Sequence, residues 1–276
     1  MVTGGTSGMG LETAKALAHR GAKVVIVGRN CPKCEDVVCQ IKDQTNNPNI
    51  NYMLADLSSQ DQIRKLASDF KKKYKALHVL INNAGGFFLK KELSRDGIEM
   101  TFALNYLSHF LLTNLLLDLL KKSAPARIIN VSSWEHFRAE FDADNLQSEK
   151  GYFCWNAYAK SKLGNILFTY ELARRLEDSG VTVNTLHPGW VATNIGKNNG
   201  VLAKLLLPLI QRKAVPAAEG AKTCIHLAVS DHVSGISGKY FAKEKEGKSS
   251  QHSYNLDHAK KLWQMSEELC GISNRN

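Results

Sequence analysis

A chain of 276 residues with 43% hydrophobic side chains is long enough for one large α/β domain and apolar enough for a complete core. Its formal net charge of +10 would suit nucleic acid, anionic lipid or a phosphate-rich cofactor, but no basic patch interleaved with aromatic residues supports nucleic acid. Six cysteines without the spacing of a disulfide framework argue against a disulfide scaffold and indicate a reducing compartment.

Signals for membrane insertion and secretion are weak in this sequence. No uninterrupted apolar run reaches the roughly 18 residues that indicate a membrane span, and the longest, residues 111–120, is broken by Thr113, Asn114 and Asp118. We expect that run to be a buried helix. No secretory signal is visible, so we expect a cytoplasmic protein, with a position on the endoplasmic reticulum or another membrane surface as the alternative.

A glycine-rich loop opens the chain. Residues 3–10 read Thr-Gly-Gly-Thr-Ser-Gly-Met-Gly and run directly into a helical pattern over residues 11–20. Glycine allows a tight turn and close approach of the backbone to a phosphate, and the helix N-terminus adds N–H donors and positive potential. Only Met1 and Val2 precede the loop, where a strand of about 5–6 residues is usual. We therefore expect a truncated first strand, with lower stability and weaker cofactor binding.

The next apolar run, residues 23–28, is nearly continuous, as in a parallel strand buried on both faces. It ends at Arg29, whose planar guanidinium suits a phosphate group. An arginine that is merely solvated at a strand end is the alternative. Cys31, Cys34 and Cys39 follow, but no fourth ligand lies nearby, so we expect no metal site.

Two further strands end in polar turns. Residues 50–54 form the third strand pattern and lead to Asp56 and Leu57. Residues 79–81 form the fourth strand pattern and lead to the turn Asn82-Asn83-Ala84-Gly85. Carboxyl ends of strands are where open α/β sheets bind ligands, so both turns are candidates for a binding site.

A long helix is predicted over residues 97–123, with Asn105 inside it. Asparagine is mildly unfavourable in a helix interior, so Asn105 is either a polar residue on the helix surface or a functional group. Residues 126–131 form the fifth strand and bring Ser132 and Ser133 to its carboxyl end.

Tyr158 and Lys162 lie four residues apart in a segment with a helical pattern. Residues at this spacing share a helix face, with about 5–6 Å between Cβ atoms, so the phenol and the ammonium can reach one site. A neighbouring cation favours the phenolate, so we expect Lys162 to lower the pKa of Tyr158 and make it a general acid or base. A surface helix on which the two residues merely share a face is the alternative.

In this order the motifs resemble the short-chain dehydrogenase/reductase family, whose members carry Thr-Gly-x-x-x-Gly-x-Gly, Asn-Asn-Ala-Gly, a catalytic serine and Tyr-x-x-x-Lys. The resemblance runs from Val2 to about Ile272, and residues 104–118 are similar to the retinol-dehydrogenase-like branch. It implies a Rossmann-type α/β fold, a doubly wound parallel sheet with helices on both faces, formed by residues 1–276 as a single domain.

The resemblance also implies roles for the site residues. Ser133 would polarise the substrate oxygen, Tyr158 would exchange the proton, and Lys162 would assist Tyr158 and bind the nicotinamide ribose. Asn105 would distort its helix and hold a water that links Lys162 to solvent. The residues expected to bind the cofactor are Thr3, Gly4, Gly8, Met9, Gly10, Arg29, Asp56, Leu57, Asn83, Ala84, Gly85, Tyr158, Lys162, Pro188, Gly189 and Thr193. Arg29 stands where an acidic residue would select NAD, which favours NADP over NAD.

Residues 134–155 form an insertion that also matches this branch. Its aromatic residues either wall a substrate pocket or fill the core. They are Trp134, Phe137, Phe141, Tyr152, Phe153 and Trp155.

The second half of the chain continues the α/β pattern, with strands at 181–187 and 239–242 and helices at 217–230 and 256–270. Between them lies an apolar stretch, residues 201–210, framed by basic residues at 197, 204, 212 and 213. A buried helix, a substrate lid and a segment that touches anionic lipid are the alternatives. Because the family places its lid here, we expect a lid at about 194–215 that also contacts membrane.

We therefore expect an NADP-dependent oxidoreductase that transfers hydride between the nicotinamide and a lipophilic alcohol, aldehyde or ketone. A retinoid, a polyprenoid, a steroid and a lipid aldehyde are the candidate substrates. A cofactor-binding protein with little or no turnover is the alternative, because the first strand looks truncated. We expect a small lipophilic substrate as partner and no nucleic acid.

Overall fold

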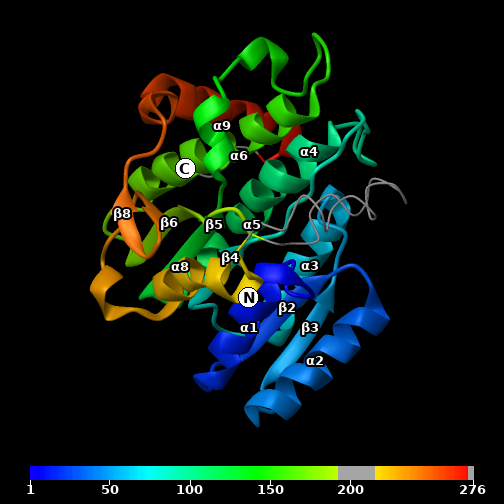
Figure 1. Cartoon of the computed structure of the whole chain (residues 1–276), viewed down its shortest axis with the longest axis vertical. Coiled ribbons are helices and arrows are strands. Elements are labelled where there is room, and N and C mark those ends of the chain that lie inside the picture. The colour runs from blue at the N-terminus through cyan, green and yellow to red at the C-terminus, as the bar shows by residue number, and fades with distance from the viewer. Residues whose placement is uncertain (192–214, 273–276) are drawn as a thin grey trace.

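Eight strands form one sheet in the order β3-β2-β1-β4-β5-β6-β7-β8 (Figure 1). The computed structural model describes residues 1–191 and 215–272. The first seven strands are parallel, and the short β8 pairs antiparallel with β7 at the edge. The strands are β1 (Val2–Thr3), β2 (Val24–Gly28), β3 (Ile50–Leu54), β4 (Val79–Asn82), β5 (Ala126–Val131), β6 (Val181–His187), β7 (Lys239–Ala242) and β8 (Lys245–Gly247). The predicted doubly wound parallel sheet is confirmed, although β8 was not predicted.

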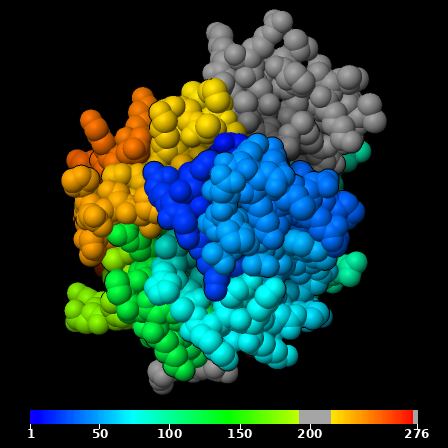
Figure 2. Space-filling model, turned by 90° about the horizontal axis from the view of Figure 1, so that it is seen from below, coloured from blue at the N-terminus to red at the C-terminus, as the bar shows by residue number. Residues whose placement is uncertain are grey.

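Helices cover both faces of the sheet (Figure 1). One face carries α1 (Gly8–His19), α2 (Cys31–Thr45) and α8 (Ala217–Val229). The other face carries α3 (Gln60–Lys73), α5 (Ser108–Lys122) and α6 (Cys154–Arg175), with α9 (Leu256–Cys270) packed against α6. Although α1 and α8 come from distant parts of the sequence, they lie side by side (Figure 2).

Strand β2 shows why the central apolar runs are continuous. Val25 and Val27 face the core beneath α3 and α5, whereas Val24 and Ile26 face the core beneath α1, α2 and α8. Successive side chains of a strand point to opposite faces, so a strand with helices on both sides needs an apolar residue at every position.

The first strand is short but central. Val2 pairs with Ile26 of β2 and with Ile81 of β4, and the Met1 carbonyl accepts a hydrogen bond from the Ile81 N–H at 3.0 Å. β1 therefore has the two residues expected from the sequence and still carries the glycine-rich loop at its carboxyl end. The expected effects on stability and cofactor binding stay predictions.

The helix predicted over residues 97–123 begins later than expected. Gly97 lies in a turn with a φ of +75°, and the Glu99 side chain caps the helix through two 2.8 Å hydrogen bonds from backbone N–H groups. The helix then starts as α4 (Met100–Phe102), continues through a π-helical turn, η1 (Ala103–Leu107), and passes into α5. The apolar periodicity could not reveal the turn, because Ile98 is buried beside it.

This continuous helix is the one segment of the described residues that could cross a membrane by length and composition. The stretch Met100–Lys122 has 23 residues, and 67% of its apolar window is buried inside the protein. Leu111, Leu116 and Leu120 are fully buried, as in the core helix predicted for this run.

Candidate active site

The loop after β1 has the backbone that its glycines predict. Gly4 (φ +64°) and Gly8 (φ +55°) lie in the left-handed region, which glycine adopts without strain. A Cβ atom at Gly10 would lie 2.3 Å from the Gly4 carbonyl oxygen, so only glycine fits where the loop meets α1. The N–H groups in the first turn of α1 have no intrahelical acceptor and can bind a phosphate. The loop therefore fits the pyrophosphate of a dinucleotide.

The turn after β4, residues 82–85, is fixed to this loop. The Thr3 hydroxyl oxygen accepts hydrogen bonds from the N–H groups of Asn83 and Ala84 at 2.9 and 3.0 Å. Asn83 Nδ2 in turn donates to the Thr3 carbonyl at 2.8 Å. The two predicted cofactor segments at the carboxyl ends of β1 and β4 are thus in direct contact.

Asn105 lies in the π-helical turn η1 and is fully buried. Its Oδ1 accepts from the Gly86 N–H at 2.7 Å, and its Nδ2 donates to Ser161 Oγ at 3.1 Å. Its carbonyl oxygen accepts from Asn165 Nδ2 at 3.0 Å. The expected distortion of the helix is present, and π-helical turns of this kind often occur at functional sites.

Ser132 and Ser133 follow β5 and have different surroundings. Ser132 Oγ donates to the Lys162 carbonyl at 2.8 Å and so belongs to the packing between β5 and α6. Ser133 Oγ accepts from the Glu135 N–H at 3.3 Å and hydrogen-bonds with the Tyr158 side chain. Ser133 is therefore the serine that faces the phenol.

Tyr158 and Lys162 lie one turn apart on α6, and both are buried. Lys162 Nζ lies 5.6 Å from the centre of the Tyr158 ring and donates to the Val131 carbonyl at 3.1 Å. A Cβ atom at Gly85 would lie 3.2 Å from Asn105 Oδ1 and 3.6 Å from Lys162 Nζ. The structure thus brings all four predicted catalytic side chains to the carboxyl edge of β4 and β5.

The expectation that Lys162 lowers the pKa of Tyr158 is wrong for this arrangement. Burial raises the pKa of Tyr158 to about 12, although the hydrogen bond with Ser133 acts in the opposite direction and Glu135 raises it further. Burial also lowers the pKa of Lys162 to about 8. Desolvation is the largest cause of the shift in the Tyr158 pKa, and the Lys162 ammonium donates its hydrogen bond to the Val131 carbonyl.

Predicted adenosine contacts follow β2 and β3 at the same edge of the sheet. Arg29 directly follows β2 and is exposed, so the position where an acidic residue would favour NAD carries a guanidinium. Asp56 follows β3, and its Oδ1 accepts from the N–H and the hydroxyl of Ser58 at 3.0 and 2.7 Å. Leu57 beside it is buried. These positions are compatible with the predicted contacts, which stay predictions.

The predicted nicotinamide side of the cofactor site follows β6. Pro188 and Gly189 come directly after this strand, and Gly189 has a φ of +83° and donates its N–H to His187 Nδ1 at 2.9 Å. Thr193 lies outside the described residues, and so does the predicted lid at about 194–215 except for Val215.

The aromatic residues of the 134–155 insertion divide between the two alternatives. Trp134 and Trp155 are 57% and 49% exposed. Trp155 packs on Phe87 with 4.8 Å between ring centres, and the Phe87 ring meets the Tyr158 ring at 5.6 Å. Phe141 instead packs against the core. An aromatic surface therefore lies beside Tyr158, and part of the insertion fills the core.

Two polar partners of Asn105 were missed in the sequence. Ser161 and Asn165 lie three and seven residues after Tyr158, on the buried face of α6. Polar side chains at helical spacing on a face that is otherwise apolar are the signal that could have identified them.

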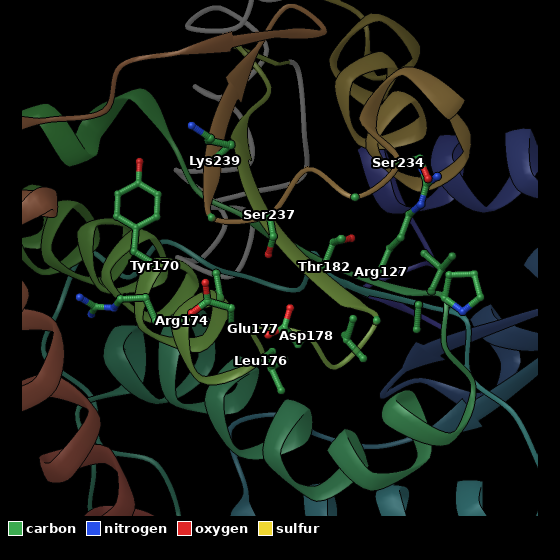
Figure 3. Close-up of a pocket in the computed structure, with 18 of the residues that line it drawn as sticks. Arg127, Tyr170, Arg174, Leu176, Glu177, Asp178, Thr182, Ser234, Ser237 and Lys239 are labelled. Atoms are coloured by element: carbon green, nitrogen blue, oxygen red, sulfur yellow. The ribbon is translucent and has the colours of Figure 1, made fainter.

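A groove of about 1150 Å³ lies at the opposite edge of the sheet (Figure 3). Its walls include Arg127, Thr182 and Lys239, at the starts of β5, β6 and β7, together with the C-terminal end of α6. The candidate catalytic residues follow the other ends of these strands, so the groove is separate from the candidate active site.

Comparisons with known proteins agree with the motifs. A family model for short chain dehydrogenases matches residues 1–201. Polyprenol dehydrogenase of Homo sapiens is 45% identical over 281 residues, which cover 99% of this chain and 84% of that protein. Retinol dehydrogenase 12 of Mus musculus is 42% identical over 272 residues, which cover 99% and 86%. Among solved structures, the Pseudomonas aeruginosa RhlG/NADP active-site complex matches with a TM-score of 0.69 and 27% identity, over 87% of this chain and 92% of that chain.

Proposed function

Since the chain belongs to the short-chain dehydrogenase family, and is thus a nicotinamide-dependent oxidoreductase, we propose that it transfers hydride between NADP(H) and a lipophilic alcohol, aldehyde or ketone. The observation that carries the proposal is the meeting of Ser133, Tyr158 and Lys162 at the carboxyl edge of the sheet. The alternative of a binding protein without turnover has no support from this site, because all four candidate catalytic side chains are present, with Asn105, Tyr158 and Lys162 buried.

We propose NADP as the cofactor. The N–H groups at the start of α1 would hold the pyrophosphate, and Arg29 would pair with the 2′-phosphate. Asp56 and Leu57 would meet the adenosine, while Lys162 would bind the nicotinamide ribose beside Tyr158. The RhlG complex contains NADP, which supports this choice.

When bound, the nicotinamide supplies or accepts the hydride. In the reductive direction, the Ser133 hydroxyl donates a hydrogen bond to the substrate carbonyl oxygen and polarises it. Tyr158, with a pKa of about 12, is protonated at neutral pH and donates its phenolic proton to that oxygen. The Lys162 ammonium stabilises the phenolate that results.

For Asn105 we propose the expected link between Lys162 and solvent. Its side chain is occupied by Gly86 and Ser161, and its carbonyl oxygen accepts one hydrogen bond from Asn165. A carbonyl oxygen has two lone pairs, so this atom can still accept from a water beside Lys162.

A lipophilic substrate is proposed from two features. The exposed rings of Trp134 and Trp155, with Phe87 between Trp155 and Tyr158, offer an apolar surface next to the reacting groups. The names of two relatives, polyprenol dehydrogenase and retinol dehydrogenase 12, indicate long apolar alcohols. Because such alcohols dissolve in membranes, contact with a membrane surface is part of the proposal.

The proposal is tested by NADPH oxidation with a panel of carbonyl compounds. Long-chain, retinoid and polyprenoid aldehydes should be reduced with higher kcat/KM than glyceraldehyde, and faster with NADPH than with NADH. Tight NADPH binding without oxidation by any member of the panel would refute the enzymatic proposal. A preference for glyceraldehyde would refute only the substrate class.

A further inference from the structure

His136 lies in the turn that follows the candidate catalytic serine, and the function proposed above gives it no part. The turn is a short 3-10 helix, η2 (Trp134–Arg138), in which His136 is 0% exposed. Its ring packs between those of Phe137 and Tyr240, with 4.1 and 5.2 Å between ring centres. A buried imidazole has to pair its polar nitrogens, so its partners indicate what it holds in place.

Both ring nitrogens of His136 have backbone partners. Nδ1 lies 2.6 Å from the Ser133 carbonyl oxygen, and Nε2 lies 3.0 Å from the Ser250 nitrogen. The Ser250 N–H can only donate, so Nε2 has to be the unprotonated nitrogen. The neutral ring then carries its proton on Nδ1 and donates it to the Ser133 carbonyl. Burial lowers the pKa of His136 to about 4, so the ring is neutral at pH 7.

These two hydrogen bonds join segments that are far apart in the sequence. Ser250 precedes the turn η6 (Gln251–Tyr254), and its neighbour Ser249 hydrogen-bonds through Oγ to the Tyr170 hydroxyl of α6 at 2.7 Å. The Ser133 carbonyl also accepts from the His136 backbone N–H at 3.2 Å. His136 thus connects the main chain of Ser133 to a segment that is itself attached to α6.

We infer that His136 is a positioning residue for Ser133, holding the serine main chain so that its hydroxyl faces the Tyr158 phenol. Apart from that phenol, the Ser133 hydroxyl has one hydrogen-bond partner among the described residues, the Glu135 N–H at 3.3 Å. The direction of the hydroxyl therefore depends on the backbone of Ser133. The inference rests on the catalytic role proposed above for Ser133.

Three substitutions separate the two hydrogen bonds. His136→Asn places an amide donor near the position of Nδ1 and can still bind the Ser133 carbonyl. The longer side chain of His136→Gln places its amide at the position of Nε2. It can accept a hydrogen bond from the Ser250 N–H but does not bind the Ser133 carbonyl. His136→Phe keeps an aromatic ring and makes neither bond. His232→Asn, at an exposed position in η5 (Asp231–Val233), is the matched control.

The rate to compare is kcat per NADPH-binding site, with NADPH binding measured by fluorescence titration. His136→Gln and His136→Phe should lose roughly tenfold to hundredfold, the scale expected when a reacting group is displaced by about 1 Å. His136→Asn and the control should keep most of the rate, and the KM for NADPH should not change. A purely structural role would lower the melting temperature and the number of binding sites but leave kcat per site equal in all variants. That result, or a His136→Asn enzyme as slow as His136→Phe, would overturn the inference.

A second measurement does not depend on turnover. The ¹⁵N spectrum of histidine-labelled protein at pH 7, with the His136 signals identified by their loss in His136→Phe, should show the Nδ1–H tautomer. An Nε2–H tautomer would break the link to Ser250 and overturn the inference. If none of the carbonyl compounds makes the wild-type protein oxidise NADPH, the proposed function fails. The tautomer of His136 still decides whether this residue holds Ser133 as described.

Discussion

Lys162 Nζ lies 5.6 Å from the centre of the Tyr158 ring, yet its hydrogen bond goes to the main chain of Val131. Burial shifts the two pKa values in opposite directions, that of Tyr158 to about 12 and that of Lys162 to about 8. Both shifts favour the uncharged form, because a buried charge loses its hydration. At pH 7 the phenol is protonated and the lysine remains largely charged, so the pair is prepared to donate a proton.

Replacing Lys162 by methionine should lower the activity and raise the stability of the protein. The folded pKa of about 8 lies below the ordinary value of 10.5, so the folded state binds this proton less tightly than the unfolded state. The cost of burying the charge is fully present below pH 8 and disappears as the pH rises to 10.5. Lys162→Met should therefore raise the free energy of unfolding at pH 7, by up to about 3 kcal/mol, and much less at pH 10. Its kcat and its NADPH affinity should both fall.

Thermal unfolding at the two pH values and NADPH titration measure these effects. Lys160→Met is a matched control, because Lys160 lies on the same helix and its ammonium donates to the Asn145 carbonyl at 2.9 Å, away from the candidate site. An equal stabilisation of Lys162→Met at pH 7 and pH 10 would show that the buried charge is not the cause.

Changing Arg29 to aspartate should change the cofactor preference. Arg29 is exposed at the carboxyl end of β2, where an aspartate would repel the 2′-phosphate of NADPH and accept hydrogen bonds from the ribose of NADH. The ratio of kcat/KM for NADPH and NADH should therefore shift towards NADH. Lys23→Asp, at the other end of β2, changes the net charge equally and should leave the ratio unchanged. If both variants keep the wild-type ratio, another residue sets the preference.

A methyl group at Gly10 should damage the cofactor loop. In Gly10→Ala the new Cβ would lie 2.3 Å from the Gly4 carbonyl oxygen and 2.5 Å from Asn83 Nδ2, and the loop can relieve this overlap only by moving. NADPH affinity should fall at least about tenfold, and the free energy of unfolding by about 1–3 kcal/mol. Gly247→Ala is the control, because its nearest contact would be at 3.7 Å. Calorimetric titration and chemical denaturation check both values, and a Gly10→Ala protein that matches the control would contradict the close approach.

Much of the fold follows from local sequence signals. The run 24–27 is apolar at every position because its residues alternate between two cores, and the polar motifs after it mark the carboxyl ends of successive strands. The order of Asn82, Ser133 and Tyr158 along the chain therefore places them at one edge before any coordinates are known. Apart from the parallel direction of the strands, no long-range information is needed to predict this shared edge.

Other features depend on partners that no local pattern contains. The pKa of Tyr158 follows from its burial, its hydrogen bond with Ser133 and the charge of Glu135, and the spacing of Tyr158 and Lys162 gives none of these. The partners of Asn105 on α6 lie 56 and 60 residues away, and the Ser250 partner of His136 lies 114 residues away. The start of the helix at Met100 was missed because the turn at Gly97 is set by backbone conformation.

The most direct test of the proposed chemistry is aldehyde-dependent NADPH oxidation by Tyr158→Phe. The substitution removes only the phenolic hydroxyl and keeps the ring that packs on Phe87. The kcat should fall by ~10²–10⁴, the usual contribution of a general acid, while the dissociation constant for NADPH stays close to that of the wild-type protein. Tyr74→Phe removes a hydroxyl from the residue that follows α3, where the ring packs on Phe70 and not on the candidate site, and should keep its kcat. A Tyr158→Phe enzyme with a kcat near that of the wild-type protein would contradict the assignment of Tyr158 as the proton donor.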